Sequence, residues 1–358
     1  MSGPALDRLI AEIDEQPQVV ARLIDTQRAA VREAARMIRE RQPSAIVLVA
    51  RGSSDNAAVY GRYLLEVCNR QLTSLAAPSG LTLYGRGPRL DRTVVIGVSQ
   101  SGQGEDVVEY VREARAQGAA TIAIVNDEQS PLAEAAETVL ACLAGPELSV
   151  PATKTVTAQM VLLALLSIEL EDDATHSEPL AGLPEALGQA LRERAAAAAM
   201  ARSLATRTVG SVIGRGFGFP PALEIALKLK EMCHTRTEPF SGADFVHGPV
   251  ALVQPDYSAL LIDVGGRSSE SALGLAQAIR QRCGAPILLR AGEIVPAVED
   301  DPTPKLRTPQ LLLEAPIAEP FAPIVALVLG QLLAVELALA RGLDPAQPRG
   351  LRKVTSTR

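Results

Sequence analysis

The stretch Ser99-Gln100-Ser101-Gly102 places hydroxyl and amide side chains and a glycine directly after an apolar, β-branched run at 94–98. Such a run is typical of a buried parallel strand, and the residues from Glu105 onward predict a helix. A strand that leads through this turn into a helix N-terminus presents backbone N–H groups, hydroxyls and the positive end of a helix dipole. The turn therefore predicts a phosphate site that uses no lysine; a plain strand–helix turn with capping serines is the alternative.

A second group of reactive side chains lies on a helix predicted over 222–233, which begins after Pro220-Pro221. Its apolar residues recur at helical spacing and predict a buried face. Glu224, Lys228 and Glu231 fall on another stripe of the same helix. Because a crossover helix in an α/β fold is largely buried, we expect a proton-transfer base and an ammonium partner here. A solvated salt-bridge stripe is the alternative.

His247 directly precedes Gly248-Pro249, where a chain reversal is predicted to hold the imidazole in a defined place. His176 and His234 have no such setting and are predicted to be structural or surface residues. The C-terminal stretch 347–355, which contains Lys353, has the composition of a disordered basic tail.

The elements that must position these residues alternate between strands and helices. The first 41 residues predict helices interrupted at Gln16-Pro17, and the polar stretch 172–179 marks the predicted domain boundary. Before that boundary the pattern predicts strands at 45–50, 94–98, 121–125 and 138–141, with helices at 56–67, 106–116 and 158–171. After it the pattern predicts strands at 209–214, 259–264, 287–290 and 311–313.

The two halves share landmarks at a nearly constant offset. Ala50-Arg51-Gly52 corresponds to Gly214-Arg215-Gly216, and Ile96-Gly97-Val98 is predicted to correspond to Ile262-Asp263-Val264. This predicts a tandem duplication and an α/β fold with two doubly wound parallel sheets. Ligands of such sheets bind beyond the carboxyl ends of the strands, where Ser54 and the Ser99 turn fall.

Composition narrows the class of protein. A length of 358 residues favours two domains, and a net charge of −6 with 3% aromatic residues argues against nucleic acid as a partner. The four cysteines are widely spaced and predict reduced thiols, and the three histidines lack the spacing of a zinc site. The glycines at 214, 216 and 218 do not match the dinucleotide fingerprint, so neither a metal nor an organic cofactor is expected.

The N-terminus lacks a basic segment followed by an apolar core, so no signal peptide is expected. The apolar stretch at 321–340 has the composition of a buried helix, and no membrane span is expected. These features predict a cytoplasmic protein.

Taken together, these motifs resemble the isomerase half of glutamine–fructose-6-phosphate aminotransferase, the glucosamine-6-phosphate synthase family, which consists of two sugar-isomerase (SIS) domains. The resemblance covers nearly the whole chain and rests on motifs at 12–17, 51–54, 99–102, 153–154, 222–231, 247–249 and 347–353. It implies N-terminal helices over 1–41, SIS domains over 42–178 and 195–340, and a tail over 341–358 that closes the active site.

The resemblance also implies roles for single residues. It implies that the sugar phosphate and nearby hydroxyls are bound by Ser54, Ser99, Gln100 and Ser101. It also implies that Val150 lines the sugar pocket. Glu231 moves a proton between carbons 1 and 2, with Lys228 beside it. His247 assists ring opening from the neighbouring subunit, which implies a homodimer. Lys353 forms a Schiff base with the open-chain ketose or acts by charge.

Three positions depart from the family pattern. Ser2 stands where the family's glutaminase domain has its nucleophilic cysteine, so glutamine is not the expected nitrogen donor. Gly104 replaces a threonine of the phosphate loop, and Arg352 stands where a small residue is usual.

Without a glutaminase, deamination is the expected direction, and the chain resembles stand-alone two-SIS-domain glucosamine-6-phosphate deaminases. The expected reaction converts glucosamine 6-phosphate to fructose 6-phosphate and ammonia. A fructosamine-6-phosphate deglycase, an ammonia-dependent glucosamine-6-phosphate synthase and a non-catalytic sugar-phosphate regulator are the alternatives. The sequence leaves open gluco or galacto configuration, the physiological direction, an allosteric ligand, and dimer or tetramer.

Overall fold

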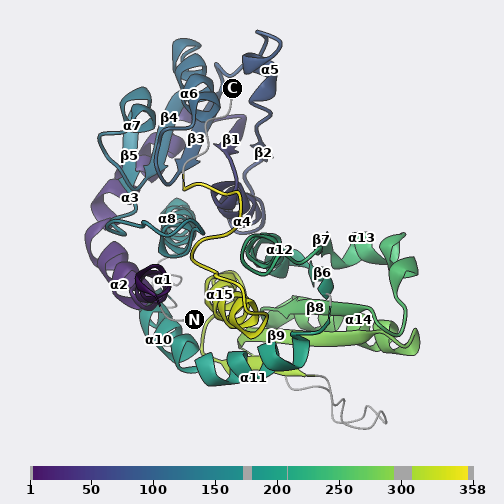
Figure 1. The fold of residues 1–358 in the computed structure, drawn as a ribbon. Helices are drawn as coiled ribbons and strands as arrows, with labels where there is room; N and C mark the ends of the chain where they lie inside the picture. Colours follow the sequence, from purple (N-terminus) through teal and green to yellow (C-terminus); the bar gives the residue numbers. More distant parts are fainter. Residues whose placement is uncertain (1–2, 172–179, 208, 294–308, 354–358) are drawn as a thin grey trace. The chain divides into compact units, whose positions relative to one another are not determined.

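The computed structural model describes residues 3–171, 180–207, 209–293 and 309–353, and these form two compact units, each built on a five-stranded parallel sheet (Figure 1). The described residues of the first unit are 15–148, 152–171, 180–181 and 352–353. Those of the second unit are 3–14, 149–151, 182–207, 209–293 and 309–351. The predicted fold class is confirmed. The predicted boundary at 172–179, with His176, lies outside the described residues, as does the end of the tail from Val354.

The sheet of the first unit has the strand order β2-β1-β3-β4-β5, with every pair parallel. Its strands are β1 (Ala45–Ala50), β2 (Thr73–Leu75), β3 (Thr93–Ser99), β4 (Ala120–Val125) and β5 (Thr138–Ala141). The apolar runs of β1, β3 and β4 are buried because helices cover both faces of the sheet. Strand order reverses between β1 and β3, and ligands of doubly wound folds bind at such a switch point.

Helices on both faces hold this switch point in place. The first unit contains α2 (Gln16–Thr26), α3 (Arg28–Arg41), α4 (Ser53–Val67), α5 (Ser79–Thr82), α6 (Glu105–Ala116), α7 (Pro131–Ala135) and α8 (Lys154–Leu170). Helices α6 and α7 pack on one face through a core that includes Val47, Val95, Val111 and Leu132. Helices α3, α4 and α8 pack together and contact the strands from the other side.

The second unit repeats this topology, with the order β10-β9-β8-β6-β7 and every pair parallel. Its strands are β6 (Val209–Gly214), β7 (Glu238–Ser241), β8 (Ser258–Asp263), β9 (Ala285–Gly292) and β10 (Gln310–Glu314). Its helices are α1 (Pro4–Asp14), α10 (Leu183–Arg192), α11 (Arg194–Leu204), α12 (Phe219–Cys233), α13 (Gly242–Val246), α14 (Ser269–Gln281) and α15 (Ala322–Ala340). Short 3-10 turns η2 (Gly216–Gly218), η3 (Pro249–Leu252) and η4 (Gly266–Ser268) join them.

The strand register corrects one detail of the predicted duplication. Ala50 lies opposite Val98, and its counterpart Gly214 lies opposite Ile262. Val98 therefore corresponds to Ile262, and the predicted match of Val98 with Val264 was wrong by two residues. The error has a physical cause, because strands that are apolar on both faces carry no alternation that fixes their register.

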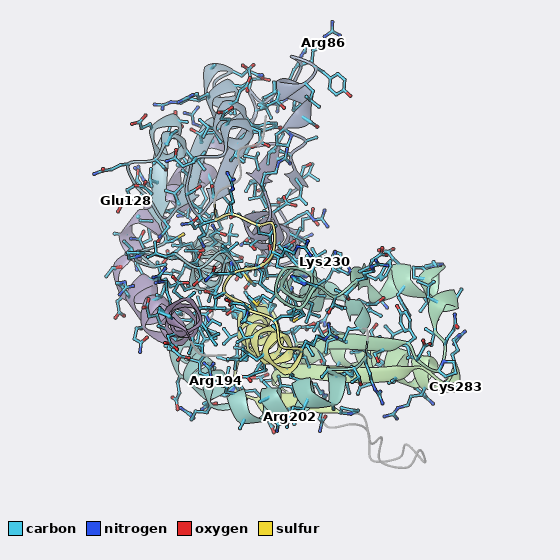
Figure 2. The ribbon with its side chains drawn as sticks, in the orientation of Figure 1. Arg86, Glu128, Arg194, Arg202, Lys230 and Cys283 are labelled. Carbon is cyan, nitrogen blue, oxygen red and sulfur yellow. The ribbon has the colours of Figure 1, made fainter. Side chains whose placement is uncertain are left out.

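Helix α15 has the length and composition of a membrane-spanning helix, but 89% of its apolar window is buried within the protein. It packs against α10, α11, α12 and β9 of its own unit. The prediction of a buried helix at 321–340 is therefore confirmed. All four cysteines are free; Cys142 and Cys233 are buried, Cys68 is half-buried and Cys283 is exposed (Figure 2).

Candidate active site

The turn after β3 leads from the strand into α6, and its serines accept backbone hydrogen bonds. The backbone N–H of Gly102 donates to Ser99 Oγ at 3.1 Å, and that of Gln103 donates to Ser101 Oγ at 3.3 Å. Gly102 has a φ of +63°, and a Cβ at this position would collide with the side chain of Ser130. The turn therefore requires glycine here, and it presents half-buried serines next to the N-terminus of α6.

Charge at the first turn of α6 is balanced by a residue from the neighbouring strand end. Arg51, directly after β1, donates through Nε to Asp106 Oδ2 at 2.6 Å. The Asp106 side chain is only 2% exposed, whereas that of Arg51 is 48% exposed. The end of β1 is thus tied to the first turn of α6, and a guanidinium stands beside the predicted phosphate turn. No role was predicted for Arg51 from the motif that contains it.

Ser54 lies in the first turn of α4 and is buried. Its Oγ accepts a hydrogen bond from Gln159 Nε2 of α8 at 3.0 Å. The Oε1 atom of Gln159 is buried and has no hydrogen-bond partner among the described residues. A buried acceptor without a partner is costly in a folded protein, so this amide is a candidate substrate contact that sequence reasoning missed.

Lys353 is tied to a buried carboxylate of the same unit. Its Nζ lies 2.6 Å from Glu147 Oε2, and the Glu147 side chain is fully buried. Glu147 also accepts from the backbone N–H groups of Thr153 and Thr155 and from Thr155 Oγ1. Burial raises the pKa of Glu147, but the Lys353 ammonium and these hydrogen bonds outweigh it and hold the pKa below the ordinary value. The composition of this tail is typical of a disordered segment, but the ion pair holds the Lys353 side chain in place.

The stripe on α12 is a buried cluster and not a solvated one. Lys228 Nζ lies 2.6 Å from Glu231 Oε2 and 3.4 Å from Glu224 Oε1. The side chains of Glu224 and Lys228 are 2% and 1% exposed, while that of Glu231 is 21% exposed. Burial alone lowers the pKa of Lys228, but the two carboxylates raise it above its ordinary value. An ammonium thus holds Glu231 in place at the edge of the cluster.

His247 follows α13 and is exposed. Its backbone N–H donates to Asp244 O at 3.1 Å, and Ser241 caps α13 through the Asp244 N–H, so the backbone of this turn is fixed as predicted. Among the described residues, none forms a hydrogen bond or ion pair with the imidazole. Val246 and Leu252 beside it are 50% and 55% exposed.

Val150 lies in the second unit, in the segment 149–151. The backbone N–H of Ser149 donates to both carboxylate oxygens of Glu12 in α1, at 3.3 Å each, which fixes the segment next to Val150. The structure therefore joins Ser99 with Ser101 on one turn and Lys228 with Glu231 on one helix. It adds Glu147 and Gln159, which no sequence motif singled out as site residues, and it buries Glu224 of the predicted stripe.

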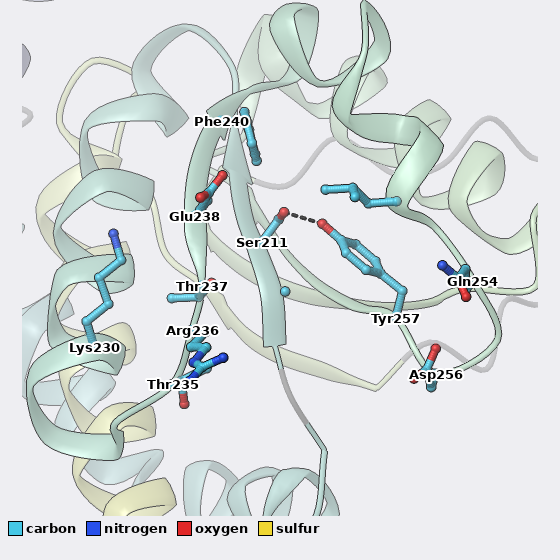
Figure 3. A pocket seen from close by; sticks show the side chains of 12 residues that line it. Ser211, Lys230, Thr235, Arg236, Thr237, Glu238, Phe240, Gln254, Asp256 and Tyr257 are labelled. Atoms are coloured by element: carbon cyan, nitrogen blue, oxygen red, sulfur yellow. Dashed lines mark hydrogen bonds between the residues drawn. The ribbon is translucent and has the colours of Figure 1, made fainter.

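A cavity of about 820 Å³ opens elsewhere in the second unit, at the start of β6 and beside β7 (Figure 3). Tyr257 and Ser211 are hydrogen-bonded within it, and Lys230 of α12 reaches it from the side (Figure 3). None of the nine predicted site residues lines this cavity. Within the described ranges, no cluster of three His, Cys, Asp or Glu side chains has the arrangement of a metal site.

Comparisons with known proteins agree with this architecture. A family model described as the SIS domain matches residues 40–168. The isomerizing glutamine–fructose-6-phosphate aminotransferase of Thermococcus kodakarensis is 32% identical over 355 residues, which cover 96% of this chain and 57% of that protein. The chain therefore spans a little over half the length of this curated relative.

Two solved structures extend the likeness over the full fold. A proposed phosphosugar isomerase from Silicibacter pomeroyi DSS-3 has a TM-score of 0.83 at 30% identity, covering 94% of this chain and 99% of that one. A glucosamine-6-phosphate deaminase from Thermotoga maritima has a TM-score of 0.76 at 20% identity, covering 98% and 100%, and shares the fold.

Proposed function

The chain belongs to the SIS-domain family, and on this premise we propose that it is an amino-sugar phosphate isomerase that deaminates glucosamine 6-phosphate to fructose 6-phosphate and ammonia. The observation that carries the proposal is the buried cluster on α12. A surface salt bridge contributes little and needs no burial, whereas a buried ammonium between two carboxylates is costly to build. Its one partly exposed member, Glu231, is proposed as the base for proton transfer.

The phosphate is proposed to bind at the switch point of the first unit. The Ser99–Ser101 turn supplies half-buried serine hydroxyls, and the N-terminus of α6 favours an anion. Arg51 supplies the nearby positive charge, which offsets the acidic first turn of α6. Ser54 and the unpartnered Gln159 Oε1 are proposed to read hydroxyl groups of the sugar.

The reaction requires no redox change. His247 assists opening of the sugar ring to the aldehyde, and Glu231 then removes the proton from carbon 2 and returns it to carbon 1. The carbon 2 amine thereby becomes an imine, which water hydrolyses to the ketone of fructose 6-phosphate with release of ammonia. General acid–base catalysis of this kind supplies about 10²–10⁴-fold per group.

Lys353 is proposed to act by charge in the resting protein. Its ammonium is paired with the buried Glu147 carboxylate, and a paired ammonium is a poor nucleophile until it loses its proton. His247 is proposed to serve the neighbouring subunit of a homodimer. Its exposure beside the exposed apolar residues Val246 and Leu252 supports this role.

The proposal is tested by product analysis. The purified protein is incubated with glucosamine 6-phosphate, galactosamine 6-phosphate and a 6-phosphorylated fructosamine, and ammonia and fructose 6-phosphate are measured. Release of both products from glucosamine 6-phosphate supports the deaminase. Glucose 6-phosphate with an amine, formed only from the fructosamine, would replace it with the deglycase. No turnover of any substrate, together with binding of the sugar phosphates, would replace it with the regulator.

A further inference from the structure

The turn after β8 is the structural repeat of the phosphate turn after β3. With the offset fixed by the strand register, Gly266 corresponds to Gly102, and their φ angles are +59° and +63°. Helix α14 begins at Ser269 and α6 at Glu105, which are separated by the same offset. The duplicated fold therefore places a glycine turn and a helix N-terminus at the same position in both units, although the second turn forms the 3-10 helix η4 and the first does not.

In the second unit this turn is already occupied by a carboxylate of the chain itself. The backbone N–H groups of Arg267 and Ser268 donate to Glu319 Oε2 at 2.9 Å and to Glu319 Oε1 at 3.2 Å. Glu319 comes from the segment between β10 and α15. A Cβ at Gly266 would collide with this carboxylate, so the turn closes tightly around it. Both carboxylate oxygens are bound, as two oxygens of a phosphate would be.

The residue at the end of β8 also differs from its counterpart at the end of β3. Asp263 stands at the position of Ser99, and its Oδ1 accepts from the Gly265 N–H at 3.0 Å and from Ser269 Oγ at 2.7 Å. Its Oδ2 accepts from Arg290 Nε at 2.7 Å, which neutralises the buried charge. The Nη2 atom of Arg290 is buried and has no hydrogen-bond partner among the described residues. Arg290 therefore keeps one unused N–H donor, Nη2, for an oxyanion, while its charge already balances that of Asp263.

We propose that the turn Gly265–Ser268 is an oxyanion site for phosphate-type ligands that the Glu319 carboxylate keeps closed. The site lies within the second unit and is independent of the proposed deaminase activity. As a consequence, of these two turns only the one after β3 is open to phosphate. Removal of the carboxylate opens the second turn to inorganic phosphate.

The test compares the full-length parent with Glu319→Ala by thermal melting in sodium phosphate and in sodium chloride of equal ionic strength. Phosphate at the first turn raises the melting temperature of both proteins equally, so only the difference reports on the second turn. At about ten times its dissociation constant, phosphate binding raises the melting temperature of the variant by a further 3–6 °C or so. An equal rise in both proteins overturns the proposal.

Two further variants serve as controls for this test. Glu314→Ala removes an exposed glutamate at the end of β10 and is expected to respond to phosphate as the parent does. Glu319→Gln retains the side-chain volume but loses the charge and one acceptor, so its additional response to phosphate is expected to fall between those of the parent and Glu319→Ala. Should Glu319→Ala fail to fold, Glu319→Gln decides: an additional response supports the closed site, and a response equal to the parent's overturns it.

Discussion

Replacing Lys228 by methionine removes the only ammonium that contacts the two carboxylates of the α12 cluster in the part of the chain described. Glu224, at 2% exposure, then loses the Lys228 ammonium that compensates its buried charge, while Glu231, at 21%, can turn toward water. Breaking a buried ion pair in this way costs about 3–5 kcal/mol. For a unit of this size we expect the melting temperature to fall by about 6–20 °C.

The assay is calorimetric melting of the parent and variant at pH 7 to 9, with urea unfolding as a second measure of stability. The carboxylates raise the pKa of Lys228 above its ordinary 10.5, so the stabilising contribution is fully present below 10.5 and is lost only as the pH rises through the folded-state pKa. The difference between parent and variant is therefore expected to be constant across this pH range.

A matched control lies two residues away on the same helix. Lys230 is exposed, and Lys230→Met is expected to change stability by no more than about 0.5 kcal/mol (Figure 2). The double variant Lys228→Met with Glu224→Gln removes the stranded charge and is expected to recover most of the loss. A loss below about 1 kcal/mol for Lys228→Met, equal to that of Lys230→Met, would refute the buried cluster.

Three other predictions concern the turn after β3, the role of His247 and the ion pair between Glu147 and Lys353. Gly102→Ala introduces a side chain at a φ of +63° and against Ser130, which displaces the phosphate turn. The variant is therefore expected to lower kcat/KM by about tenfold or more. An unchanged kcat/KM would show that the turn is not part of the active site. His247→Ala and Glu231→Gln are each expected to be inactive alone. When the two variants are mixed so that they form heterodimers, about a quarter of the parent activity is expected to return if His247 acts across the dimer interface. No activity would return if His247 acts within its own subunit. Burial raises the pKa of Glu147, but Lys353 and hydrogen bonds lower it by more, so the stability that the Glu147 carboxylate contributes is present above pH 4.5 and is lost as the pH falls below 4.5. The stability difference between the parent and Glu147→Gln is therefore expected to shrink as the pH falls below 4.5. A constant difference would contradict the ion pair.

The sequence was sufficient for the repeated α/β pattern because strands covered on both faces form long apolar runs. Strands β1, β5 and β6 have the predicted bounds, and β3, β4, β8 and β10 differ from prediction by at most one residue at either end. The edge strands β2 and β7 were not predicted. They have only three and four residues, and β7 contains a proline, which is tolerated at a sheet edge but is a signal against a strand in the sequence.

Site residues could be predicted where they belong to a local sequence motif, and could not be predicted elsewhere. The serine turn and the α12 stripe combine reactive residue types at a recognisable spacing. Glu147 and Glu319 are single carboxylates in loops, and their partners lie 206 and about 50 residues away along the chain. Such pairings arise from tertiary folding, and no local pattern records them. Gln159 sits in an apolar helix, where its unpartnered oxygen becomes apparent only from the packing.

The central claim is most directly tested by the rate of ammonia release from glucosamine 6-phosphate by the parent and by Glu231→Gln, with Glu185→Gln as an exposed control on α10. Glu231→Gln keeps the side-chain volume but loses the base. We expect Glu231→Gln to release ammonia about 10²–10⁴-fold more slowly than the parent, and Glu185→Gln to be unaffected. Equal rates for the parent and Glu231→Gln, or no release by the parent, would contradict this claim.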